Sequence, residues 1–143
     1  MSFLGELFSS RTPDYPPLEA DSRAGRKVAE VEHEIQELMH KVKQPLEVVP
    51  SDHAAYVFIG KPPKKFGLAW IHDGKVSGFN TLIEEHGVTP AEIEKVTEQL
   101  RESYLRHDDA NHFTTTIDQR KVVVTASDAL EREVHEIIDS IVH

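Results

Sequence analysis

The sequence predicts an α+β domain in which helices cover a mainly antiparallel sheet of four to six strands, built around two hairpins. Near both ends of the chain, apolar residues recur every three or four positions, as on one face of a helix. Residues 46–79 and 112–126 instead carry short apolar runs or alternation, as in strands. Asp73-Gly74 separates two of these runs with a residue pair typical of two-residue hairpin turns. The expected order of elements is α-ββ(ββ)-αα-ββ-α.

An apolar peptide and a proline-rich connector, residues 1–20, precede the single α+β domain that we place at residues 21–143. The three prolines of the connector are incompatible with a helix interior and favour an extended chain. If the first eight residues form a helix, four large apolar side chains share one of its faces: Phe3, Leu4, Leu7 and Phe8. This stripe predicts an amphipathic docking peptide that contacts a partner protein or another copy of the chain.

Two long helices are expected at the ends of the domain. The first starts at an N-cap residue, Asp21 or Ser22, and ends before Pro45. Its buried positions step by three and four residues: Val28, Val31, Ile35, Leu38 and Val42. The last helix starts at Ser127 or Asp128, and its apolar face consists of Leu130, Val134, Ile137, Ile138 and Ile141.

The strands lie between these helices. Four runs follow the first helix, "LEVV", "AAYVFIG", "KFGLAWIH" and "KVSGF". In the hairpin closed by Asp73-Gly74, Ile71 is expected to face Val76. "HFTTTID" and "KVVVTA" form the second predicted hairpin, with Gln119-Arg120 at its tip.

Residues 83–96, "IEEHGVTPAEIEKV", have the apolar pattern of a helix-turn-helix with Gly87 at the turn. The groove-facing side of its second helix offers one lysine against two glutamates, whereas bases and phosphates are contacted mainly by Arg, Lys, Asn and Gln. Local chemistry explains the same residues. "TLIE" is a capping box with Thr81 as N-cap, Gly87 suits a left-handed helix end, and "TPAE" is a second capping box with proline at its first helical position. The sequence therefore predicts a corner between two helices.

Composition restricts the class of protein. Twenty-five acidic residues against sixteen basic ones disfavour nucleic acid and anionic membranes as partners. The chain has no cysteine, no apolar run near the ~18 residues of a membrane span, and no signal peptide, so we expect a cytoplasmic protein. Phosphate-binding glycine loops, GxSxG and HExxH are absent, which favours a non-catalytic protein without a cofactor.

A loop at residues 106–112, "RHDDANH", is the candidate site for a divalent metal or a small ligand. Its nitrogen and oxygen ligands are His107, Asp108, Asp109 and His112, a set that suits zinc or a hard cation. Asp and Asn also stabilise turns, and this is the alternative explanation of the same residues.

One compact basic spot stands out in this acidic chain. Lys61, Lys64 and Lys65 surround Pro62-Pro63. They favour contact with a phosphate or an acidic partner, or they protect a strand edge from pairing with another chain. Together these features predict a non-catalytic accessory or interaction domain that self-associates or binds a protein partner. The alternative is a small-ligand or metal-binding protein that uses the loop at 106–112.

Overall fold

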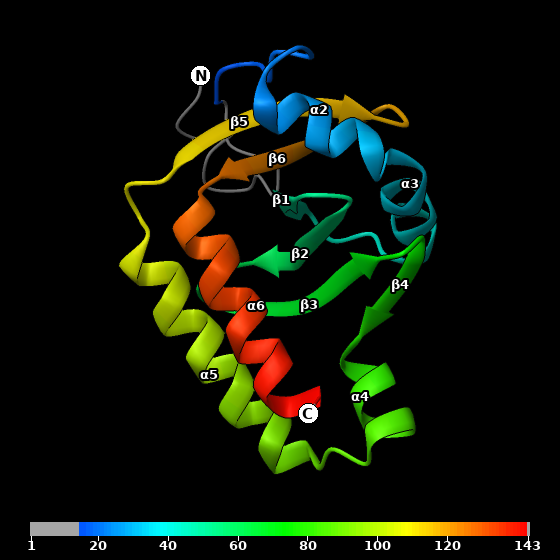
Figure 1. The fold of residues 1–143 in the computed structure, drawn as a ribbon, viewed down its shortest axis with the longest axis vertical. Helices are drawn as coiled ribbons and strands as arrows, with labels where there is room; N and C mark the ends of the chain where they lie inside the picture. The colour runs from blue at the N-terminus through cyan, green and yellow to red at the C-terminus, as the bar shows by residue number, and fades with distance from the viewer. Residues whose placement is uncertain (1–14, 143) are drawn as a thin grey trace, which may run out of the picture.

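A computed structural model describes residues 15–142, which form a six-stranded sheet with helices packed on it (Figure 1). The strand order is β4-β3-β2-β1-β6-β5, and every neighbouring pair is antiparallel except the parallel pair β1 and β6. The predicted α+β class is confirmed, and the order of elements matches the prediction except that two helices stand where one first helix was expected. In chain order the elements are α2 (Arg23–Glu30), α3 (Glu32–Lys41), β1 (Leu46–Ser51), β2 (Ala54–Lys61), β3 (Lys65–His72), β4 (Lys75–Gly78), α4 (Phe79–His86), α5 (Pro90–Arg106), β5 (Asn111–Ile117), β6 (Arg120–Ala126) and α6 (Asp128–Val142).

Each face of the sheet has its own buried cluster beneath a pair of helices. The cluster under α2 and α3 includes Val28, Ile35, Val48, Val57, Ile71 and Val124. On the other face α5 and α6 lie side by side (Figure 1), and their cluster includes Val49, Phe58, Leu68, Leu100, Leu130 and Val134. Successive residues of a strand point to opposite faces, which is why β1 contributes to both clusters. Burial of each large apolar side chain contributes about 1.5–3 kcal/mol.

The hairpin between β3 and β4 has the predicted turn and register. Asp73 and Gly74 adopt φ of 52° and 72°, the left-handed conformation that a two-residue hairpin turn requires. Ile71 pairs with Val76. The turn therefore fixes which side chains of β3 face α6.

The hairpin between β5 and β6 turns one residue earlier than predicted. Asp118 and Gln119 occupy the two left-handed positions, with φ of 53° and 67°, and Arg120 is already paired in β6. Arg120 leaves the tip because its guanidinium group donates hydrogen bonds to carbonyl groups at the end of α3. The acceptors are Met39, Val42, Lys43 and Gln44.

The predicted first long helix is two helices. Ser22 is its N-cap, as predicted, and its side chain accepts a hydrogen bond from the N–H of Gly25. At Val31, which is buried with φ of −119°, the chain leaves the helical conformation, and α3 begins at the next residue. The bend keeps Val28 and Ile35 on the same buried cluster. Apolar spacing of three and four residues continues through the bend, so the periodicity did not reveal it.

The corner between α4 and α5 is confirmed, but α4 begins earlier than predicted. Gly78 is its N-cap, and the hydroxyl of Thr81, three residues into the helix, accepts a hydrogen bond from the Gly78 N–H. Gly87 ends α4 with φ of 65°. Thr89 and Glu92 form the predicted capping box at the start of α5, with proline at the first helical position.

The described end of the proline-rich connector lies along β5. The Thr114 N–H donates a hydrogen bond to the Pro16 carbonyl at 2.9 Å, and the Leu18 N–H donates to the Thr114 carbonyl at 2.8 Å. Pro17 forms a parallel bridge with Thr114. The connector is therefore extended here, and it covers part of the outer edge of the sheet.

Candidate functional site

A cleft of about 440 Å³ opens beside α6, at the end of the β1–β2 hairpin and the adjacent end of β3. Its volume lies in the range of ~300–1,000 Å³ that is usual for ligand sites. The lining combines aromatic, aliphatic and ionisable side chains, and the ones that define its chemistry are Tyr56, Trp70, Glu131, His135, Ile138 and Asp139.

α6 supplies the ionisable wall of the cleft. Glu131, His135 and Asp139 recur every four residues and therefore share one face of the helix. The helix starts where the Ser127 hydroxyl accepts a hydrogen bond from the Leu130 N–H at 3.1 Å. The neighbouring stripe is buried against the sheet and consists of Leu130, Val134 and Ile138. Burial of that stripe fixes the rotation of α6 and turns its ionisable stripe toward the cleft.

Two aromatic residues line the cleft from the sheet. Tyr56 on β2 and Trp70 on β3 are direct partners across the two strands, so their side chains lie on the same face. The Tyr56 hydroxyl lies 2.6 Å from Nδ1 of His135. Burial, followed by the negative charges of Glu131 and Asp139, raises the pKa of Tyr56 above its usual range. The phenol therefore stays protonated.

The charge of the cleft is negative. Three carboxylates and two histidines line it, and its lining includes no lysine or arginine among the residues that the structure describes. The Ser51 hydroxyl donates a hydrogen bond to Glu131 at 2.8 Å. Ser51 is therefore held by a carboxylate. Carboxylates beside aromatic rings attract cations.

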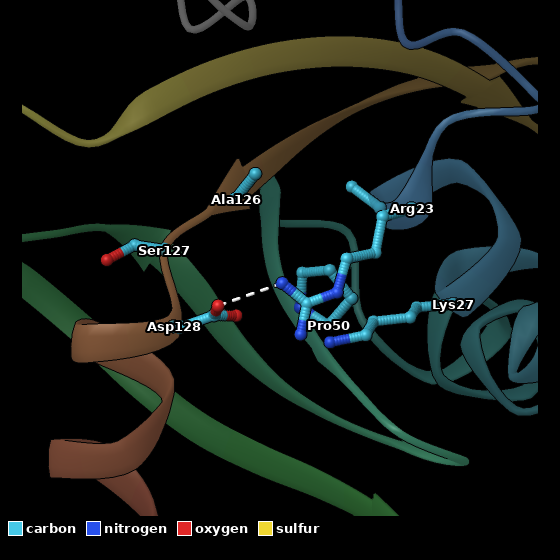
Figure 2. A pocket seen from close by; sticks show the side chains of 7 residues that line it. Arg23, Lys27, Pro50, Ala126, Ser127 and Asp128 are labelled. Carbon is cyan, nitrogen blue, oxygen red and sulfur yellow. Dashed lines mark hydrogen bonds and ion pairs between the residues drawn. The ribbon is translucent and has the colours of Figure 1, made fainter.

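A smaller pocket of about 130 Å³ lies between the start of α2 and the start of α6 (Figure 2). Arg23 and Lys27 of α2 point toward it, and Arg23 pairs with Asp128 at 2.9 Å. Lys27 lies 3.6 Å from Asp52. Because each cation already has a carboxylate neighbour, this pocket is a junction between two helices and not a charged binding site.

A buried polar network joins β1, β5, β6, α5 and the connector. Glu47 accepts hydrogen bonds from the hydroxyl groups of Tyr104 and Thr125. His112 Nδ1 lies 2.9 Å from the Thr125 hydroxyl, and the Tyr15 ring stacks on His112 at a centroid distance of 4.8 Å. Burial and the charge of Glu47 raise the pKa of Tyr104. The network satisfies a buried carboxylate and fastens the connector to the sheet.

Glu133 of α6 is the centre of a cluster that fastens α6 to α5. It accepts hydrogen bonds from Ser103 at 2.7 Å and Arg106 at 2.6 Å, and His107 Nε2 lies 2.8 Å from its other oxygen. Hydrogen bonds from Arg106, Ser103 and His107 lower the pKa of Glu133 to about 2. The carboxylate thus stays charged, and it holds the C-terminal end of α5 against α6.

The predicted metal ligands of the loop at 106–112 have different neighbours. His107 contacts Glu133, and His112 contacts Thr125. Asp108 and Asp109 are exposed. Within residues 15–142, no group of three or more His, Asp and Glu side chains is placed to hold a metal ion. Metal binding by this loop stays a prediction.

The predicted basic spot is an exposed turn between β2 and β3. Lys61, Lys64 and Lys65 are all exposed there. Arg101 of α5 holds the turn, since its guanidinium group donates hydrogen bonds to the carbonyl groups of Pro63 and Lys64 and lies 5.5 Å from the Phe66 ring centroid. The predicted docking stripe lies outside the described residues: Phe3, Leu4, Leu7 and Phe8.

Sequence reasoning missed the cleft. One pattern indicated it, because Glu131, His135 and Asp139 form an ionisable stripe next to the apolar stripe of the last helix. The aromatic side of the cleft had no comparable pattern. Tyr56 and Trp70 become neighbours only through the register of β2 and β3.

Comparison with known proteins found no matching family model, curated protein or solved structure. No helix in the described part of the chain is long and apolar enough to cross a membrane. A functional proposal therefore depends on the chemistry of the cleft.

Proposed function

We propose that this protein is a non-catalytic accessory or interaction domain, and that the α6 cleft binds a cationic side chain of a partner protein. The observation that carries the proposal is the convergence of Glu131 and Asp139 on the paired rings of Tyr56 and Trp70. A lysine or arginine side chain fits this arrangement, because its stem packs on the rings and its charge faces the carboxylates. The acidic, cysteine-free composition supports a cytoplasmic location.

The energies favour a protein partner over a free small cation. A cation against an aromatic face contributes about 0.5–2 kcal/mol, and an exposed ion pair contributes about 0.2–1 kcal/mol. Their sum falls short of the ~4 kcal/mol that corresponds to millimolar affinity. A partner that presents the cation on a larger complementary surface supplies the remaining free energy.

Trp70 makes the proposal measurable, because it is the single tryptophan of the chain and lines the cleft. Because a single cation binds more weakly than millimolar, we expect a tetralysine peptide to change its fluorescence only at concentrations of roughly 1–100 mM, and a tetraglutamate peptide to leave it unchanged at the same ionic strength. The double variant Glu131→Gln, Asp139→Asn should weaken tetralysine binding roughly five- to tenfold, since it removes two charges and keeps the shapes.

The matched control is Asp108→Asn, Asp109→Asn. It lowers the negative charge of the protein by the same amount at a site away from the cleft. If both double variants weaken the peptide equally, binding follows net charge and the cleft is not the site. Equal responses to tetralysine and tetraglutamate would also contradict the proposal.

A further inference from the structure

The hairpin of β2 and β3 has opposite charges at its two ends. Lys61 pairs with Lys65 at the turn, while Ala54 pairs with His72 at the other end, where the cleft opens. Ala54 and Lys61 are the two ends of β2, and at ~3.3 Å per residue they lie roughly 23 Å apart. The lysines of one chain therefore do not reach the cleft of the same chain.

The turn is suited to present its charge. Its three exposed lysines form no ion pair with any residue between 15 and 142. Arg101 bonds two carbonyl groups of the turn and packs on Phe66, so the backbone beneath the lysines is held from α5. A held backbone lowers the entropy lost on binding, which favours a specific contact over a diffuse one.

We propose that the lysine turn, Lys61, Lys64 and Lys65, of one copy of this chain binds in the α6 cleft of a second copy. The inference rests on the proposed function and names the partner as another copy of the chain. Charge complementarity supports it, since the turn carries three exposed lysines and the cleft is lined by Glu131, Asp139 and two aromatic rings, whereas its third carboxylate, Asp52, already lies 3.6 Å from Lys27. The net charge of −9 opposes association at long range, but salt screens that repulsion beyond about 8 Å at physiological ionic strength.

The geometry limits the kinds of assembly. The two contacting surfaces are different and lie at opposite ends of one hairpin, so a single contact leaves one turn and one cleft of the pair unoccupied. These two surfaces then bind each other across a two-fold axis in a closed dimer, or they bind further copies head to tail into a chain or ring. The average molecular mass in solution should therefore rise with protein concentration and fall at high salt.

The test uses two variants of the full chain that each lose one surface. The turn variant is Lys61→Glu, Lys64→Glu, Lys65→Glu, and the cleft variant is Glu131→Lys, Asp139→Lys. Each alone should stay monomeric in sedimentation velocity. An equimolar mixture should regain assembly into dimers and larger species, because the turn variant keeps an intact cleft, the cleft variant keeps an intact turn, and the two reversed surfaces are themselves oppositely charged.

The control for net charge is Lys41→Glu, Lys43→Glu, Lys95→Glu, which changes three exposed lysines outside the turn and should assemble like the wild type. Circular dichroism checks folding. If charge reversal disrupts the fold, the neutral variants Lys61→Gln, Lys64→Gln, Lys65→Gln and Glu131→Gln, Asp139→Asn replace it, with weaker assembly expected from each.

Two results would overturn the inference: a wild-type protein that is monomeric at all concentrations, or a mixture that fails to regain assembly. If Trp70 fluorescence still reports tetralysine binding in that case, the partner is a different protein and the proposed function stands. If tetralysine binding is also absent, both proposals are wrong.

Discussion

Replacement of Gly60 by alanine should destabilise the protein strongly, because the backbone at this position excludes a side chain. Gly60 has φ of +119°, a conformation that residues with a Cβ atom rarely adopt. An added Cβ would lie 2.7 Å from the carbonyl oxygen of Lys65 and 3.2 Å from Cα of Phe66. Both neighbours are backbone atoms of β3, so a side-chain rotation does not relieve the contact.

The surrounding hydrogen bonds limit relaxation. Gly60 is paired with Phe66 in the sheet, and its N–H donates a hydrogen bond to the Pro45 carbonyl at 2.9 Å. Unfavourable backbone conformations cost about 1–3 kcal/mol, and the overlap with β3 adds to that. We expect a total loss of about 2–4 kcal/mol in the free energy of unfolding. For a chain of this size the melting temperature should fall by about 10 °C.

Gly67→Ala is the matched control on the neighbouring strand. An added Cβ there meets no atom within 4 Å, and the backbone is not in the left-handed region. Alanine reduces the entropy of the unfolded chain, so this variant should be more stable by about 0.4–1 kcal/mol. Urea unfolding followed by Trp70 fluorescence and far-ultraviolet circular dichroism gives both values. A Gly60→Ala loss below about 0.5 kcal/mol, or equal effects of the two changes, would refute the reasoning.

Two further predictions concern the contacts that fasten α6 and the connector. The pKa of Glu133 is lowered to about 2, so its stabilisation is complete above its ordinary pKa of 4.5 and is lost as the pH falls toward 2. Glu133→Gln should therefore lower the free energy of unfolding by about 1 kcal/mol at pH 7, and this loss should disappear as the pH falls toward 2. Urea unfolding at a series of pH values measures the loss, and a loss that is the same from pH 7 to pH 2 would contradict the reasoning. Tyr15→Ala removes the ring stacked on His112 and should lower the free energy of unfolding by about 0.5–1.5 kcal/mol. Hydrogen exchange at the Thr114 amide, which bonds to the connector, should accelerate, and an unchanged rate would show that the connector stays docked without the ring.

Features that depend on a few neighbouring residues were determined by the sequence alone. Asp73-Gly74 specifies its hairpin turn because only certain residues tolerate two successive left-handed positions. The capping box of Thr89 and Glu92 likewise closes within one helical turn. Strand alternation and helix periodicity gave the class and order of elements, since each buried face repeats with the period of its own backbone.

The second hairpin turn and the bend at Val31 depended on contacts between distant segments. Asp118 and Gln119 adopt left-handed conformations without glycine, and Arg120 binds carbonyl groups 76 to 81 residues away. The bend lets two helices follow one buried face, although the apolar spacing fits a single straight helix equally well. Such choices are decided by long-range packing and hydrogen bonds, which local propensity does not contain.

The cleft belongs entirely to the tertiary structure. Tyr56 and His135 are 79 residues apart in the chain, yet their side chains share a hydrogen bond. Trp70 joins them through strand register, and the ionisable stripe of α6 lines the cleft because the apolar stripe beside it is buried. The four-residue spacing of that stripe is visible in the sequence, but whether the stripe lines a cleft depends on the residues of the sheet that it faces. Apolar burial is non-directional, so a sequence pattern shows which face of a helix is covered without showing which residues of the sheet it meets.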